Sequence, residues 1–221
     1  MKTIRMKLSK KNRGALLMII GLVLVLAAAS LTGYNIWDET RAENAMSQVL
    51  SELDILAETE KTDDRILNIP GISDIPEYVL NPFKDMPAQI IDGNSYIGVL
   101  EVPSLGLRLP VMEEWSYPNL KISPCHYSGS AYLKNMVVAG HNYRSHFGSL
   151  NRLSVGDEII FVDMDENRFI YTVSETEIVM PTDIAQMITG DWDLTLFTCT
   201  LGGRTRFTVR CTEITGSTAK D

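Results

Sequence analysis

Charged residues are absent between positions 14 and 36, although the chain as a whole is acidic. At about 1.5 Å per helical residue, this run spans roughly 34 Å, and a bilayer core is about 30 Å thick. A cleaved signal peptide is the alternative, with Ala27, Ala28, Ala29 and Ser30 as its candidate cleavage site. Its apolar region is usually only about 7–15 residues long, so the length favours an uncleaved transmembrane anchor.

Acidic residues are absent from the first 13 positions. Basic flanks remain in the cytoplasm, so we expect a single-pass protein of the cell membrane with its N-terminus inside and Trp37 onward outside. The net charge is −8 despite this basic head, which makes the exported part strongly acidic and argues against a nucleic-acid partner. The basic residues are Lys2, Arg5, Lys7, Lys10, Lys11 and Arg13.

Cysteine is scarce, and its number is odd: Cys125, Cys199 and Cys211. Three cysteines in an exported chain cannot all pair internally, so at least one free thiol is expected. Internal repeats and low-complexity segments are also lacking, and about 185 exported residues suffice for one domain with a core plus a stalk.

A helix followed by a linker is expected after the anchor. Between Asp38 and Lys61, apolar residues recur at spacings of three and four, which predicts a helix that packs on the chain's own domain or forms a stalk. Too few heptads are present for a convincing coiled coil. Four prolines between residues 66 and 88 then predict an extended linker. The apolar stripe consists of Met46, Val49, Leu50, Leu53 and Leu56.

The rest of the chain has the pattern of an all-β fold. Short β-type runs separated by turns predict a closed or nearly closed antiparallel barrel with short helices. Residues 165–167 are expected to form a hairpin turn. The expected strands are residues 96–103, 105–109, 136–140, 157–162, 168–173, 194–199 and 206–211.

Cys199 closes one expected strand and Arg206 opens the next, with a loop containing Gly202 and Gly203 between them. If these strands pair in antiparallel fashion, both residues lie at one rim of the barrel. Side chains alternate along a strand, so Cys211 belongs to the apolar set of its strand and is expected in the core. His141 directly follows another strand-like run.

The segment TLFTC ending at Cys199, with Arg206 after it and His141 upstream, resembles the sortase family of Gram-positive cysteine transpeptidases. The resemblance covers roughly residues 90–215. It implies an eight-stranded barrel, preceded here by the transmembrane and stalk helices. It also implies Cys199 as nucleophile, His141 as general acid–base and Arg206 as stabiliser of the substrate carbonyl or oxyanion. Neither a cofactor nor a metal is expected.

The other histidines and a metal site are weaker candidates. His126 and Cys125 are strand neighbours on opposite faces, which makes a poor dyad. His146 is expected to line a loop near the site or to be solvated. A zinc site of Cys125, His126, His141 and His146 matches no standard ligand spacing.

The other arginines and the acidic residues are also weaker candidates. Arg204 lies in the glycine-bearing loop, and Arg210 lies further along the strand, away from the rim. Asp163, Asp165 and Glu166 could suggest calcium, which one sortase class binds, but a solvated hairpin tip is favoured. The triplet Asn81-Pro82-Phe83 is similar to the Asp-Pro-aromatic lid of pilin-building sortases, with Asn replacing the acid, and a plain linker is favoured.

The resemblance implies that the chain cleaves a C-terminal LPXTG-like sorting motif of secreted proteins through a thioester on Cys199. An amine of a peptidoglycan precursor or a pilin lysine would then accept the acyl group. The alternatives are a thiol endopeptidase that uses water, and a non-catalytic barrel that binds cell-wall peptides. The short stretch 174–193 leaves little room for the helical insertion of class B, which favours class D over a class B relative.

The expected organisation has five parts. Residues 1–13 form the cytoplasmic head and residues 14–36 the anchor. Residues 37–89 form the stalk helix and linker, residues 90–215 the catalytic barrel and residues 216–221 a tail. The segment from Val173 to Asp193 is expected to shape the substrate groove.

Overall fold

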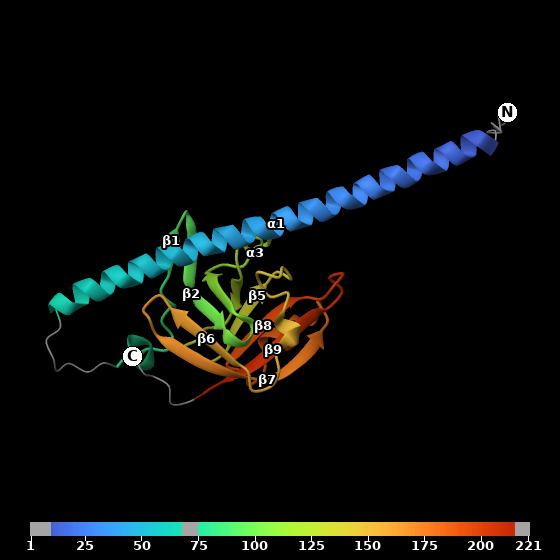
Figure 1. The fold of residues 1–221 in the computed structure, drawn as a ribbon. Coiled ribbons are helices and arrows are strands. Elements are labelled where there is room, and N and C mark those ends of the chain that lie inside the picture. Colours follow the sequence, from blue (N-terminus) through green and yellow to red (C-terminus); the bar gives the residue numbers. More distant parts are fainter. Residues whose placement is uncertain (1–9, 68–74, 215–221) are drawn as a thin grey trace, which may run out of the picture. The chain divides into compact units, whose positions relative to one another are not determined.

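The computed structural model describes residues 10–67 and 75–214. Helix α1 (Lys10–Leu67) comes first, and its stretch from Gly14 is long and apolar enough to cross a membrane, judged by length and composition. The chain divides into two compact units, one up to Thr40 and one from Arg41 onward. The barrel belongs to the second unit, and most of its strands are labelled in Figure 1.

The strands are β1 (Gln89–Ile91), β2 (Asn94–Val102), β3 (Leu107–Met112), β4 (Cys125–Ser128), β5 (Met136–Gly140), β6 (Glu158–Asp163), β7 (Arg168–Val179), β8 (Leu194–Cys199) and β9 (Arg206–Glu213). The short helices are α2 (Glu77–Leu80), α3 (Tyr117–Leu120) and α4 (Ile184–Ile188), with 3-10 turns at Pro103–Leu105 and Leu150–Arg152.

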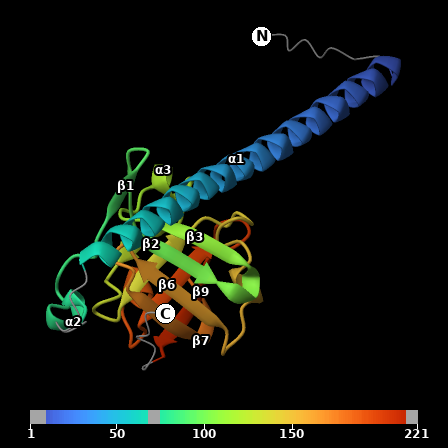
Figure 2. The same cartoon turned by 60° about the vertical axis from the view of Figure 1, so that its left-hand side comes forward.

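The sheet closes into the expected eight-stranded barrel. Its strand order is β1-β2-β3-β4-β5-β8-β9-β7-β6, and the β2–β6 pairing joins the ends, with β1 attached outside the ring as a short hairpin partner of β2. Figure 2 shows β6 in front, beside β2 and β7. Two pairings, β3–β4 and β5–β8, are parallel, so the barrel is mixed rather than wholly antiparallel.

The inside of the barrel forms the main core. Alternate residues of the strands, such as Leu100, Phe161 and Leu196, are fully buried there. Cys211 belongs to this cluster, which confirms its expected place in the core.

A second apolar layer lies between the barrel and the later part of α1. Val49 and Leu53 are buried against Tyr96 and Val99 of β2, while Met46 joins the main core. The helical stripe expected to pack on the chain's own domain is therefore confirmed at these positions. Leu56, also expected in this stripe, is 41% exposed.

Two expectations about elements were wrong in part. Strand β7 does not end at Val173 but continues to Val179, because residues 173–179 pair with residues 206–211 of β9. The expected linker, where the structure describes it, contains α2, whose Tyr78 stacks on Tyr132 at 4.7 Å. Residues 68–74 of that linker lie outside the described residues.

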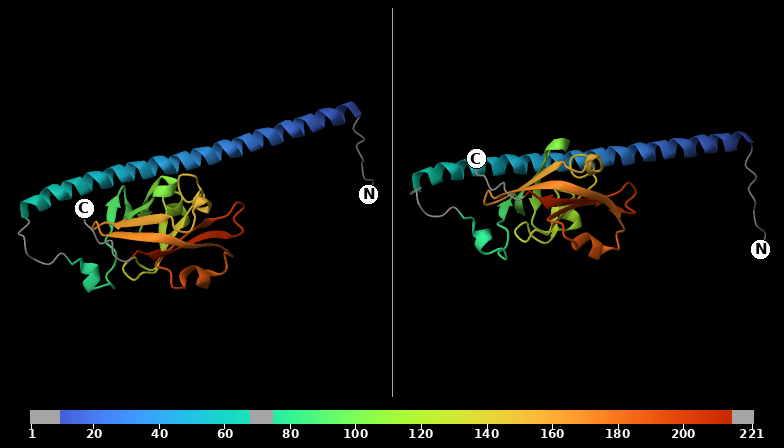
Figure 3. Two further views of the ribbon diagram at one scale, coloured as in Figure 1. Left: turned by 60° about the horizontal axis from the view of Figure 1, so that its bottom comes forward. Right: turned by 90° about the horizontal axis from the view of Figure 1, so that it is seen from below.

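Helices α2 and α4 lie at opposite ends of the barrel (Figure 3, green and orange). Lys84, just after α2, forms an ion pair with Asp165 in the β6–β7 turn, whereas α4 follows the other end of β7. The triplet Asn81-Pro82-Phe83 therefore lies away from the end that carries Cys199. This position agrees with the favoured expectation that the triplet is not a lid.

Candidate active site

The three residues expected at the site occupy one row across three adjacent strands. Gly140 of β5 lies opposite Thr198 of β8, and Cys199 lies opposite Arg206 of β9. His141 follows Gly140 directly, and β5 and β8 run parallel, so His141 comes level with Cys199. Positions 141, 199 and 206 therefore meet at one end of the barrel.

Cys199 and Arg206 also belong to the same face of the sheet. Side chains alternate along a strand, and Leu196 of β8 and Val209 of β9 are buried inside the barrel. Cys199 and Arg206 each stand an odd number of residues from these core positions, so their side chains are directed to the outer face. His141 lies just beyond the end of β5, so strand alternation does not set the direction of its side chain.

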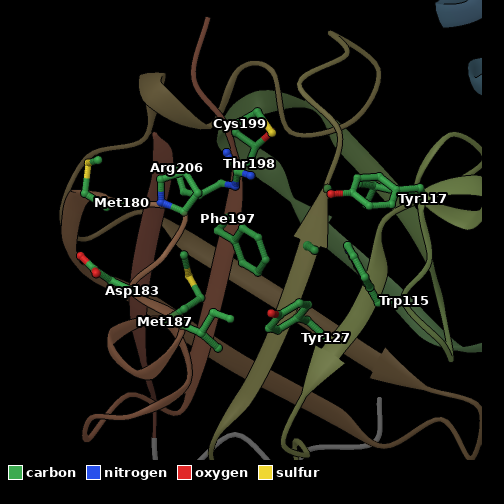
Figure 4. A pocket seen from close by; sticks show the side chains of 15 residues that line it. Trp115, Tyr117, Tyr127, Met180, Asp183, Met187, Phe197, Thr198, Cys199 and Arg206 are labelled. Carbon is green, nitrogen blue, oxygen red and sulfur yellow. The ribbon is translucent and has the colours of Figure 1, made fainter. Parts of the chain in front are cut away.

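A pocket of about 180 Å³ lies on this outer face (Figure 4). Cys199 and Arg206 line one end of it, and Phe197 and Tyr127 line its floor. The β7–β8 connection contributes one wall through Met180, Asp183 and Met187. That this pocket is the substrate groove, which residues 173–193 are expected to shape, stays a prediction. The other side chains labelled in Figure 4 are Trp115, Tyr117, Met180, Asp183, Met187 and Thr198.

The environments of the three cysteines differ sharply. None of them forms a disulfide, as the odd number required for at least one. Burial raises the pKa of Cys125 to about 12 and raises the pKa of Cys211 as well, so both remain thiols at any working pH. Cys199 is partly exposed and lines the pocket, so it is the thiol that a substrate can reach.

His141 begins a tightly closed loop. Its carbonyl accepts a hydrogen bond from the Phe147 backbone amide at 3.0 Å, and Tyr143 accepts one from Gly148 at 2.8 Å. The imidazole Nδ1 lies 3.2 Å from the backbone amide of Asn142, and the ring stacks on Tyr143 with centroids 4.2 Å apart. The loop therefore fixes both the backbone and the ring of His141.

The other two histidines have structural surroundings. His126 places its ring nitrogens 3.3 Å from the Glu113 carbonyl and 2.8 Å from the Gly129 carbonyl, outside the row. His146 is fully buried, so the expectation that it could be solvated is wrong. Burial, followed by the charge on His141, lowers the pKa of His146 to about 3, which keeps this ring neutral.

The three arginines of this region have different surroundings. Arg206 donates from Nη1 to the carbonyls of Gly203 and Thr205, each at 3.1 Å. Its Nε and Nη2 have no hydrogen-bond partner within the described part of the chain, and the residue lines the pocket. Arg204 is exposed in the loop. Arg210 is 98% buried and bonds to the α4 region instead.

The acidic hairpin is not wholly solvated, which corrects the expectation for Asp163. This residue is buried, and its carboxylate accepts hydrogen bonds from Tyr132 at 2.6 Å and from Asn167 at 2.8 Å. Burial raises the pKa of Asp163 despite these donors. Asp163 thus fixes the turn between β6 and β7, while Asp165 stays at the surface.

Several pocket residues were missed from the sequence. Trp115 lies just before α3, Tyr117 is the first residue of α3, and Tyr127 lies in β4. Their order along the chain carries no signal, because they reach the pocket only through the pairing of β4 with β5 and of β5 with β8. The stacking of Tyr143 on His141 also had no marker in the sequence.

The sequence and the structure both resemble those of known proteins. A sortase-domain family model matches residues 100–214. Sortase A from Bacillus anthracis is 26% identical over 205 residues, covering 85% of this chain and 89% of the relative. Sortase C1 from Streptococcus agalactiae is 28% identical with a TM-score of 0.50, covering 58% of this chain and 72% of that structure.

Sortase A from Corynebacterium diphtheriae shares the fold, at 18% identity and a TM-score of 0.51, over 76% of this chain and 86% of that structure. The family model alone spans more than half of the chain, and its match includes β8, β9 and the end of β5, where the row of Cys199, His141 and Arg206 lies. The chain belongs to the sortase family of cysteine transpeptidases.

Proposed function

We propose that this chain is a membrane-anchored transpeptidase that cleaves an LPXTG-like sorting motif with Cys199 and passes the acyl group to an amine. The observation that carries the proposal is the single row of Cys199, His141 and Arg206 at one end of the barrel, where Cys199 and Arg206 line a pocket. A thiolate, an imidazole and a permanent cation are the groups that acyl transfer through a thioester requires.

In the first half-reaction, the Cys199 thiolate attacks the carbonyl carbon of the scissile peptide bond. The carbon–sulfur bond forms and the carbonyl electrons move to oxygen, giving a tetrahedral oxyanion. Collapse of this intermediate breaks the carbon–nitrogen bond. Protonated His141 supplies the proton that the departing amine needs, and a thioester remains on Cys199.

In the second half-reaction, the amine of the acceptor attacks the thioester. His141, now neutral, takes the proton from the incoming nitrogen, and Cys199 leaves as the thiolate. Arg206 is suited to the oxyanion of both steps, because its Nε and Nη2 are not engaged within the described residues and because its charge persists at any working pH.

The pocket suits an extended peptide with apolar side chains. Phe197, Tyr127 and Met187 give it an apolar floor and wall, and Cys199 lies at its end. Apolar walls with a few polar groups are typical of ligand sites, in which the polar groups orient the reacting bond. A secreted protein with a C-terminal sorting motif would place its scissile bond at Cys199. The assignment of the chain to sortase class D stays a prediction.

The anchor belongs to the same proposal. Residues 14–36 would cross the membrane with the basic head in the cytoplasm and the barrel outside the cell. Substrates held at the membrane before processing would then meet the enzyme on one surface. The acceptor amine would come from a peptidoglycan precursor or a pilin lysine.

The test is intact-mass spectrometry of the full chain in detergent micelles, mixed with a panel of LPXTG-like peptides, with and without an amine. We expect an acyl adduct that is absent in Cys199→Ala and present in Cys125→Ala, and an amine-joined peptide product. Hydrolysis that ignores the added amine would support a thiol endopeptidase instead. A Cys199 that resists thiol reagents would support a non-catalytic barrel.

A further inference from the structure

The loop after β5 brings three aromatic rings into one stack next to the proposed catalytic row. Tyr143 lies parallel to His141, with centroids 4.2 Å apart and an interplanar angle of 7°. On the other side, Tyr143 meets His146 at 5.2 Å and 61°. The rings therefore follow the order His141, Tyr143, His146, from the partly exposed site into the buried interior.

The backbone of this loop leaves little freedom for the stack. The amides of His146 and Gly148 both donate to the Tyr143 carbonyl, at 3.0 and 2.8 Å. A Cβ at Gly148 would lie 2.6 Å from the carbonyl oxygens of Asn142 and Tyr143, so a glycine is needed there for the loop to close. The turn thus folds Tyr143 back over His141.

A parallel aromatic face favours a cation above it, because the face of the ring carries negative charge. Stacking on Tyr143 therefore stabilises the imidazolium form of His141 more than the neutral form. This effect matters because Arg206, in the same row, carries a positive charge that opposes protonation of His141. The negative charge of the Cys199 thiolate favours protonation of His141.

His146 supports the stack from behind without adding charge. It is completely buried, and neither ring nitrogen has a hydrogen-bond partner within the described residues. Its low pKa keeps it neutral, so it does not compete for the proton with His141. Arg144, the remaining charged residue of the loop, is exposed.

We propose that Tyr143 is a positioning residue that holds the His141 ring in place and favours its protonated form. The inference rests on the proposed function for its consequence, since protonated His141 is the acid that releases the first amine. The stack itself is testable without any catalysis. The expected effect is roughly two- to fivefold in the proton affinity of the ring, the range of an exposed cation–π contact.

The experiment is an NMR titration of full-length protein in micelles with labelled histidine. The chain has three histidines, so His126→Gln and His146→Leu assign the signals. We expect the His141 titration midpoint to fall by about 0.3–0.7 pH units in Tyr143→Leu, which corresponds to the two- to fivefold effect. In Tyr143→Phe, which keeps the ring face, it should stay at its wild-type value.

An unchanged midpoint in Tyr143→Leu would overturn the proposal, and so would an equal fall in Tyr143→Phe. Tyr143→Met serves as a second test if the leucine variant does not fold. The acid limb of the pH–rate profile should move with the midpoint, which a purely structural role would not produce. If wild-type protein shows no transpeptidation, the proposed function fails while the titration still judges the stack.

Discussion

The guanidinium of Arg210 lies 2.7 Å from the carboxylate of Glu177, although only 2% of the arginine side chain is exposed. The same guanidinium donates to the carbonyls of Gln186 and Met187 in α4, at 2.6 and 3.1 Å. Glu177 in turn accepts from the Gln186 side chain at 3.0 Å. This pair therefore fastens α4, and with it the Met187 wall of the pocket, to the barrel.

Replacing Glu177 with Gln should loosen that wall. We expect a loss of about 1–2 kcal/mol in the free energy of unfolding, because a charged hydrogen bond to a buried arginine is weakened and the glutamate is itself partly exposed. Peptide KM should rise several-fold with little change in kcat. Glu175→Gln, at an exposed position on the same strand, is the matched control and should change stability by less than about 0.5 kcal/mol. Equal effects of the two variants would contradict the prediction.

The roles of the neighbouring arginines can be separated. Removal of one oxyanion donor typically slows catalysis about 10²–10³-fold, and we expect a loss of this size in kcat for Arg206→Ala. Arg204→Ala, two residues away in the exposed loop, should change kcat by only a few-fold. Steady-state transpeptidation of the preferred peptide measures both. A larger defect in the Arg204 variant would reverse the assignment.

The number of reactive thiols should depend on folding. We expect iodoacetamide to add one label to the native chain, at Cys199, because Cys125 and Cys211 are buried and their pKa values are raised. The denatured chain should take three labels. Native Cys199→Ala should take none. Intact-mass spectrometry counts the labels, and a second label on the native chain would show that one core cysteine is accessible.

Stability should fall in acid because of His146. Its folded-state pKa is about 3, while an unfolded histidine titrates near 6.5, so the unfolded chain binds a proton that the folded chain refuses between these values. The contribution of the neutral ring is therefore complete above about pH 6.5. It is lost progressively as pH falls towards 3, by up to about 4–5 kcal/mol.

Urea unfolding at a series of pH values measures this loss. His146→Leu should flatten the slope between pH 6.5 and pH 3, while His126→Gln should retain it, because His126 is only partly buried. A wild-type slope in the leucine variant would show that other groups cause the acid sensitivity.

Gly148→Ala should damage the site by a steric route. The new methyl group would meet two backbone carbonyl oxygens at 2.6 Å, so the loop that carries His141 and Tyr143 must shift. We expect the free energy of unfolding to fall by about 1–3 kcal/mol. We also expect kcat to fall, because the loop that holds His141 is displaced. Gly106→Ala is the control: its φ is +64° but nothing lies within 4 Å, so only a conformational cost of about 1 kcal/mol should appear.

The row of site residues was only half predictable from the sequence. The short glycine-bearing loop made the pairing of Cys199 with Arg206 foreseeable, since nearby strands joined by a short loop usually form a hairpin. The position of His141 depended on the parallel pairing of β5 with β8, two strands far apart in the chain. No local pattern encodes that contact, so only the family resemblance indicated it.

The end of β7 shows where periodicity fails. Glu175 and Glu177 look like loop residues, because charge interrupts the apolar alternation. In the structure they remain in the strand, paired with Arg210 and Thr208 of β9. The charge of Glu177 is paired with Arg210, a buried arginine from a distant segment. A local sequence pattern cannot show such a pairing. His146 was misjudged for a similar reason, since its burial depends on how the loop closes.

Because Met46, Val49 and Leu53 pack on the barrel, the folded domain begins within α1, well before the first strand. Proteolysis after Leu53 would remove the residues that cover Tyr96 and Val99 and leave an exposed apolar surface on the fragment that contains the barrel. A cleaved fragment that contains the barrel would therefore keep this apolar surface covered only when the cut falls before Met46.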